Sequence, residues 1–250
     1  MSQEKKNILL YSFSGVLLLS LMTFSNVKHG NRKVEGIEIA IEEQEGIYFT
    51  DQMEVMDLVT LSQTDFVVGS ELEDLKPKAL EERVEANPFI KDAQVYRDIK
   101  GNVKVRVKQS KPIARVLMEG EDRYIDTEGN ILPVNARHTA RVPLLETAFD
   151  FKWETSLHES DYGTEIFNLI SFIEDSEFWK AQIAQILLTM NGEVELLPQV
   201  TKQKIEFGQP EQVEEKFEKL MIFYKEILPK KGWNTYSQVS LKFENQIVCK

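Results

Sequence analysis

Residues 91–109 have the sequence KDAQVYRDIKGNVKVRVKQ, which predicts a β-hairpin with strands over 91–99 and 102–109. In the second strand valine alternates with basic residues, so one face of the strand is apolar and the other is basic. Gly101 lies between the two strands, where a tight hairpin turn requires a positive φ. We therefore expect a half-buried antiparallel pair. The basic face of the second strand is a row of three residues, Lys104, Arg106 and Lys108.

The sequence before this hairpin predicts one strand and two short helices. Apolar and acidic residues alternate over 34–41, VEGIEIAI, which is typical of a half-buried strand. Asp51 and Glu54 have the spacing of a helix start, and a second helix is predicted over 75–86. The order β-α-α-β-β from 34 to 112 predicts a compact α+β unit with its helices on one face of the sheet.

The chain from 113 to 250 predicts a mixed, mainly antiparallel β domain with two flanking helices. The helices are expected over 162–179 and 211–228, each with an apolar stripe at helical spacing. The second helix is expected to end at Pro229 and Gly232, with Lys216 and Lys219 facing water. The strands are predicted over 113–118, 123–126, 131–134, 183–190, 193–197, 204–207 and 238–248.

An uncharged segment, NILLYSFSGVLLLSLMTFSNV, spans residues 7–27. A helix needs about 20 residues to cross the hydrocarbon core of a bilayer, and this segment has no polar face. We therefore expect a single transmembrane helix over 7–27, with a head over 1–6 and a linker over 28–33. The alternative is a cleaved signal peptide, for which Thr23-Phe24-Ser25 is the best cleavage site. Basic residues precede and follow the segment, so charge alone leaves its orientation open.

The composition limits the function classes. The 250 residues include 30 Lys and Arg against 41 Asp and Glu, a net charge of −11 that argues against nucleic-acid binding. The single cysteine, Cys249, excludes an intrachain disulfide and a cysteine-based zinc site. The sequence has no Walker A loop, Gly-x-Gly-x-x-Gly, His-Glu-x-x-His or Gly-x-Ser-x-Gly motif. We therefore expect no metal, no cofactor and no enzymatic activity.

Three stretches of the chain share their order with a known family. They are ALEERVEANPFIKDAQVYRDIKGNVKVRVKQSKPIARV (79–116), RYIDTEGNILPV (123–134) followed by VPLL (142–145), and WNTYSQVSLKFENQIVCK (233–250). In this order they resemble the FtsQ/DivIB family of bacterial cell-division proteins. The resemblance implies a POTRA domain over 34–112 and the family's β domain over 113–250, both in the periplasm. The turn Glu244-Asn245-Gln246 departs from the family pattern because it lacks glycine.

The resemblance also implies a function. The chain would be a bitopic scaffold of the divisome in the cell inner membrane, with its N-terminus cytoplasmic and its bulk periplasmic. It would bind the FtsB/FtsL pair and other divisome components, and thereby support septal peptidoglycan synthesis. One alternative is a POTRA-bearing secretion or outer-membrane assembly subunit, which needs further POTRA units or a barrel. The other is a membrane-anchored cell-wall hydrolase, which needs an ionisable cluster in one pocket.

The closing strand over 238–248 is the candidate partner-binding site. A strand that ends a chain often lies at a sheet edge, where unpaired N–H and C=O groups accept a partner strand. The resemblance implies that the FtsB/FtsL pair binds this edge. We expect Phe243 to anchor an apolar contact and Lys242 to meet a carboxylate; the alternative is a core Phe243 and a solvated Lys242. The predicted binding residues are Val239, Ser240, Leu241, Lys242, Phe243, Glu244, Asn245 and Ile247.

The basic row Lys104, Arg106 and Lys108 is a second candidate site. A basic strand face on an acidic protein suits recruitment by an acidic partner or contact with anionic lipid headgroups. The alternative, which we favour, is a solvated strand face that discourages edge aggregation.

Overall fold

The computed structural model describes residues 13–17, 20, 33–44, 46–60, 67–71, 73–98, 100–153 and 155–250. These residues divide into two compact units. The first unit consists of the described residues up to Glu43 together with Thr50–Gln109, and the second of Gln44–Phe49 together with Ser110–Lys250. Each unit has its own hydrophobic core.

Most of the predicted transmembrane segment lies outside the described residues, as do the head over 1–6 and most of the linker over 28–33. Of residues 7–27 only 13–17 and Ser20 are described, and they are helical. In the part of the chain that is described, no helix combines the length and the apolar character that a bilayer crossing requires.

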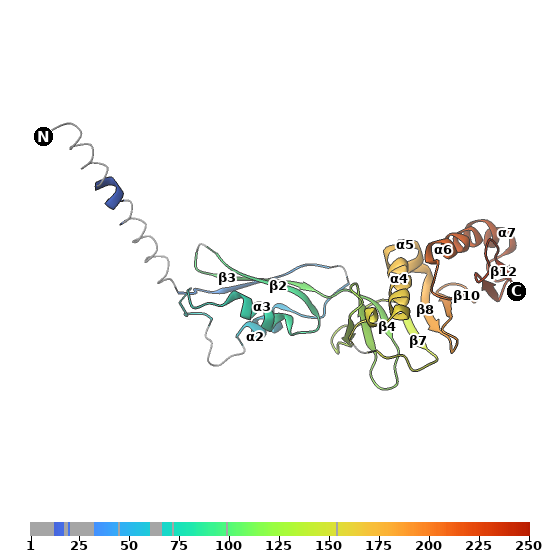
Figure 1. Cartoon of the computed structure of the whole chain (residues 1–250), viewed down its shortest axis with the longest axis horizontal. Coiled ribbons are helices and arrows are strands. Elements are labelled where there is room, and N and C mark those ends of the chain that lie inside the picture. Colours follow the sequence, from blue (N-terminus) through green and yellow to red (C-terminus); the bar gives the residue numbers. More distant parts are fainter. Residues whose placement is uncertain are drawn as a thin grey trace, which may run out of the picture. The chain divides into compact units, whose positions relative to one another are not determined.

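The first unit has the predicted order β-α-α-β-β. Its sheet has the strand order β1-β3-β2, in which the central strand β3 pairs parallel with β1 and antiparallel with β2. The helices α2 and α3 lie on one face of this sheet (Figure 1). The elements are β1 (Ile37–Ile41), α2 (Gln52–Thr60), α3 (Pro77–Glu85), β2 (Ile90–Arg97) and β3 (Val103–Gln109).

Local sequence signals explain these elements. The Asp51 carboxylate accepts a hydrogen bond of 2.8 Å from the Glu54 N–H, which caps the start of α2. Pro77 begins α3, where its missing N–H costs nothing. Gly101 has a φ of 98° in the hairpin turn. The apolar face of β3 is buried against both helices, as the period-two pattern predicts; the buried residues include Val103, Val105, Val107, Val55, Val59, Leu80 and Val84.

The second unit contains one sheet with the strand order β12-β11-β10-β9-β8-β7-β4-β5-β6. Among its described strands five neighbouring pairs are antiparallel and three are parallel, so the predicted mixed, mainly antiparallel sheet is confirmed. The strands are β4 (Pro112–Val116), β5 (Arg123–Asp126), β6 (Ile131–Pro133), β7 (Leu144–Thr147), β8 (Ile183–Leu188), β9 (Val194–Pro198), β10 (Lys204–Gly208), β11 (Gln238–Ser240) and β12 (Val248–Cys249).

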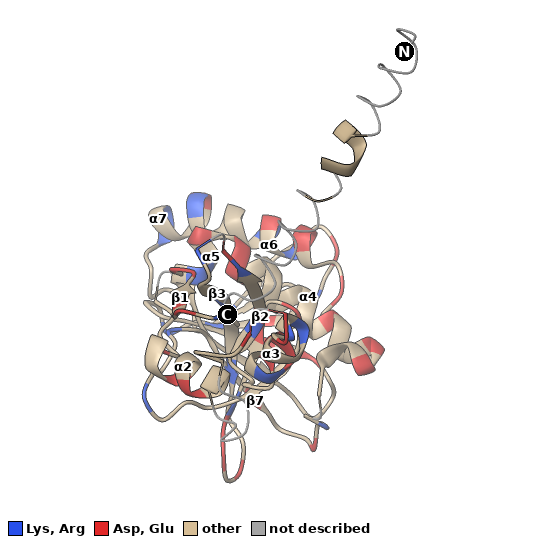
Figure 2. Ribbon diagram, turned by 90° about the vertical axis from the view of Figure 1, so that its left-hand side faces the viewer, with Lys and Arg blue, Asp and Glu red and all other residues tan. Residues whose placement is uncertain are grey.

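The helices of the second unit lie against this sheet (Figure 1). Their apolar side chains form one hydrophobic core with those of the strands. They are the short 3-10 turn η1 (Leu157–Glu159), α4 (Asp161–Asp175), α5 (Glu177–Gln182), α6 (Val213–Ile222), the π-helical turn η2 (Phe223–Ile227) and α7 (Leu228–Lys231). Acidic residues are frequent on the outer faces of α4 and α6 (Figure 2).

Both predicted helices of this unit differ in detail. The helix predicted over 162–179 is wrong, because Ser176 leaves the helical conformation and its hydroxyl caps α5 by accepting from the Trp179 N–H. The predicted end at Pro229 is also wrong. The Leu228 N–H bonds to the Phe223 carbonyl five residues earlier, and this wider π turn carries the helix through Pro229. The helix ends before Gly232, which has a φ of 101°.

The single closing strand predicted over 238–248 is wrong. The chain leaves the sheet after Ser240, turns at Asn245 (φ 56°), and returns as β12 antiparallel to β11. Asparagine tolerates this left-handed conformation better than most residues. The alternation of apolar and polar residues does not distinguish one long strand from two short ones joined by a loop.

Candidate functional site

The C-terminal margin of the nine-stranded sheet is formed by β12. The strand β11 is paired on both sides, with β10 in parallel and with β12 in antiparallel orientation. Gln238 and Lys250 exchange backbone hydrogen bonds of 3.2 and 2.9 Å, which extends the β11–β12 ladder to the last residue. Of the closing strand predicted over 238–248, the part that forms β11 is therefore internal, and the last described strand, β12, lies at the edge.

The outer side of β12 carries free backbone groups. In an antiparallel pair the residues that face the partner strand alternate with residues that face away. Because Lys250 bonds to Gln238, the N–H and C=O of Cys249 point away from β11. Among the described residues no hydrogen bond engages these two groups. Such an edge has the chemistry to accept one more strand.

The predicted binding residues fall into two groups. The side chains of Val239, Ser240 and Leu241 are buried, so they belong to the core and are not presented to a partner. The remaining residues lie in the loop between β11 and β12, or beside it: Lys242, Phe243, Glu244 and Asn245 are exposed, and Ile247 packs partly against the core.

Lys242 is paired within its own chain. Its Nζ donates a hydrogen bond of 2.6 Å to Glu193 Oε2, and this interaction raises the pKa of Lys242. Lys242 is therefore neither an unpaired solvated charge nor an unpaired cation available to a partner carboxylate. A partner carboxylate has to compete with Glu193 for it.

Phe243 is 48% exposed, so it is not part of the core. It borders a groove of about 810 Å³ between α6 and the loop, together with Ile222, Ile227 and Ile247. Exposed apolar side chains in the loop that leads into an open edge strand are suited to anchoring an added strand.

Lys219, which the sequence predicts to face water, instead holds the loop between β11 and β12. Lys219 of α6 donates from Nζ to the carbonyl oxygens of Leu241 at 3.2 Å and of Phe243 at 2.9 Å. Lys216 is also not in water: it is buried, and its Nζ donates to the Gln209 carbonyl at 2.6 Å. Burial lowers the pKa of Lys216. The helical spacing of these lysines gave no signal for either contact.

The basic row of the first unit is flanked by carboxylates. Lys104 Nζ lies 3.1 Å from Glu38 Oε2 on β1, and the hydrogen bond to this carboxylate raises the pKa of Lys104. Lys108 lies opposite Asp92 on β2, while Arg106 lies between Ala40 and Gln94. The row is thus on the central strand and is partly neutralised, and its role in recruitment stays a prediction.

One of the two edge strands of the first unit's sheet, β2, is protected. On β2 the N–H of Ala93 donates to Glu85 Oε1 at 3.0 Å, and the N–H of Val95 donates to Glu81 Oε1 at 2.8 Å. Two glutamates one turn apart on α3 thus bind two alternate N–H groups of the edge strand. Of the two edge strands β2 and β12, β12 is therefore the better suited to accept an added strand.

Replacing both glutamates tests this protection. In Glu81→Ala/Glu85→Ala we expect the Ala93 and Val95 amides to exchange with solvent hydrogen at least about tenfold faster, because each loses a charged acceptor. Hydrogen exchange measured by NMR checks the result. Glu82→Ala, an exposed residue of the same helix, serves as the matched control. Unchanged exchange in the double variant contradicts the assignment.

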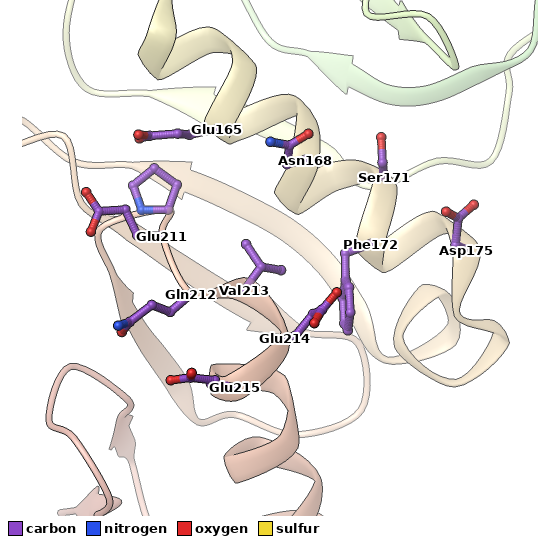
Figure 3. Close-up of a pocket in the computed structure, with 11 residues that line it drawn as sticks. Glu165, Asn168, Ser171, Phe172, Asp175, Glu211, Gln212, Val213, Glu214 and Glu215 are labelled. Carbon is purple, nitrogen blue, oxygen red and sulfur yellow. The ribbon is translucent and has the colours of Figure 1, made fainter.

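A second groove lies between α4 and the start of α6. Figure 3 shows Glu165 and Asp175 projecting from α4 and Glu211, Glu214 and Glu215 from the opposite wall. The groove has a volume of about 720 Å³, and Phe172 and Val213 add apolar surface. Within the described ranges no three His, Cys, Asp or Glu side chains are grouped as metal ligands.

Cys249 lies on β12 and is half-buried. Burial raises the pKa of the Cys249 thiol, which disfavours the nucleophilic thiolate. The residue therefore contributes its position on the edge strand and not its reactivity.

Comparisons with known proteins agree with the two units. A POTRA-like domain family matches residues 32–108, and the family described as FtsQ/DivIB, C-terminal related, matches residues 111–250. A POTRA-like unit followed by a unit of the FtsQ/DivIB C-terminal kind places the chain among two-domain cell-division proteins. The chain belongs to the FtsQ/DivIB family, as its sequence predicts. The cell division protein FtsQ of Rhodothermus marinus is 26% identical over 188 residues, which cover 73% of this chain and 68% of that relative.

Proposed function

We propose that this chain is a non-catalytic, bitopic scaffold of the bacterial divisome. Membership of the FtsQ/DivIB family and the similarity to a cell division protein FtsQ support this role. The uncharged sequence over 7–27 supports anchoring in the inner membrane by a single helix, with the N-terminus cytoplasmic and the two units periplasmic. Anchoring confines the units to a thin layer and raises their effective concentration toward other anchored proteins.

The partners in this proposal are bitopic proteins of the FtsB and FtsL type. One of them adds a strand to the outer side of β12, and the backbone groups of Cys249 provide the hydrogen bonds. The open β12 edge is the observation that carries the proposal. Through the captured pair the scaffold supports septal peptidoglycan synthesis.

Phe243 is expected to contact the added strand. In Phe243→Asp we expect capture to fall at least about tenfold, because a charge replaces an exposed apolar anchor beside the edge. The assay uses the full-length chain in detergent and a tagged periplasmic fragment of the FtsB-type protein from the same genome. Because Phe243 is nearly half exposed, the variant should keep a cooperative thermal transition.

Tyr96→Asp is the control for this variant, since Tyr96 is a similarly exposed aromatic residue of the first unit. It should capture the fragment normally. Capture by Phe243→Asp with the affinity of the unchanged chain contradicts the anchoring role.

A further inference from the structure

We propose that Lys219 is a positioning residue that holds the segment after β11 so that β12 forms the accepting edge. The proposal rests on the proposed function of that edge. Lys219 lies on α6, far from β12 in sequence. Its side chain donates hydrogen bonds to two backbone carbonyls of the loop between β11 and β12, and not to β12 itself.

The contacts of Lys219 cross the loop where it leaves the sheet. Its ammonium bonds the carbonyl of Leu241, whose side chain is fully buried, and the carbonyl of Phe243, two residues later. Both carbonyls have left the β-ladder, because the strand β11 ends at Ser240. Backbone carbonyls beside a core need a donor, and a charged donor forms a stronger hydrogen bond than a neutral one.

The returning strand needs this support because it is short. β12 has only two residues, and its register on β11 depends on a loop that reverses at Asn245. β12 pairs with a neighbouring strand on one side only, so few backbone hydrogen bonds hold it in the sheet. Lys219 fixes the loop where the chain leaves β11. The ion pair with Glu193 fixes Lys242, the residue after Leu241, beside the start of β9.

In the described part of the chain no neighbouring cation is placed to replace Lys219: the Nζ of Lys242 is engaged by Glu193. Lys216 lies one turn earlier on α6, but its Nζ is engaged by the Gln209 carbonyl and lies 4.7 Å from the centre of the Phe207 ring. The acidic residues of this stretch, Glu215 and Glu218, have no hydrogen to donate to a carbonyl when ionised. The two loop carbonyls therefore depend on Lys219 for a charged donor.

The experiment compares three variants of the full-length chain. Lys219→Met keeps the aliphatic stem and removes the donor, Lys219→Arg keeps a charged donor, and Lys225→Met removes an exposed lysine from the same helical run. Two quantities are measured on each: hydrogen exchange of the Lys250 amide, which bonds to the Gln238 carbonyl, and capture of the tagged fragment defined above.

We expect Lys219→Met to speed exchange of the Lys250 amide at least about tenfold and to weaken capture by a similar factor. Lys219→Arg should restore most of both, and Lys225→Met should change neither. The urea midpoint of the second unit should move much less than that of a core variant, because Lys219 is half-buried at the edge of the core. Faster exchange with unchanged capture overturns the positioning role, and so does unchanged exchange.

The two proposals fail in different ways. If the unchanged chain does not capture the fragment, the proposed function fails. Exchange of the Lys250 amide then decides alone whether Lys219 orders β12: acceleration in Lys219→Met supports the inference, and equal rates overturn it.

Discussion

The variant Cys249→Pro is expected to lose partner capture completely in a pull-down assay. Proline has no N–H, and its ring occupies the space in which an added strand would approach. The N–H that it removes faces away from β11, while the bonds between Lys250 and Gln238 stay intact. Proline is tolerated on edge strands when its nitrogen faces solvent, so the fold itself should be preserved.

Cys249→Ala is the matched control, since it keeps the N–H and removes only the thiol. It should capture the partner fragment nearly as well as the unchanged chain. Exchange protection of the Lys250 amide shows whether β12 is still formed in the proline variant. Normal capture by Cys249→Pro with that amide still protected would mean that the partner binds elsewhere.

The variant Phe217→Ala is expected to lower the free energy of unfolding of the second unit by about 3–5 kcal/mol. Phe217 is buried on α6 and stacks on Phe172 with ring centroids 4.9 Å apart. Its ring also lies 4.9 Å from that of Trp179 and 5.4 Å from that of Phe207 on β10. Truncation leaves a cavity where α4, α5, α6 and the sheet meet, and rigid neighbours do not refill it.

Urea unfolding followed by tryptophan fluorescence measures this loss. All three tryptophans of the chain belong to the second unit, so the signal reports that unit and not the first; they are Trp153, Trp179 and Trp233. Phe178→Ala is the control, because Phe178 is 38% exposed and should cost much less. A loss below about 1 kcal/mol in Phe217→Ala contradicts the packing described for α6.

The first unit was largely predictable because its signals are local. The alternation of valine and basic residues gave β3 and its buried face, and Gly101 gave the hairpin turn. Sequence could not show that β3 is the central strand. That position follows from parallel pairing with β1, a contact between segments more than 60 residues apart. Only this pairing places Glu38 beside Lys104 and so weakens the basic row as a binding face.

The candidate site was predicted in its place but not in its form. The chain end does lie at a sheet margin, yet period-two alternation hid the break at Ser240 and the turn at Asn245. Short strands joined by a loop keep the same alternation as one strand. Lys219 was missed for a related reason. A lysine on the polar side of an amphipathic helix is expected in water. The hydrogen bonds of Lys219 to two loop carbonyls form only because the tertiary structure brings the loop to α6.

The most direct test of strand addition uses the chain's only cysteine, Cys249, as the reporter. Single cysteines are placed at each successive position of the partner fragment, and disulfide formation with Cys249 is measured in the full-length complex. Side chains alternate between the faces of a sheet, so strand addition predicts one strong position with both adjacent positions unreactive and weaker yield two residues away. A yield spread evenly over consecutive positions, in a complex that still forms, contradicts it.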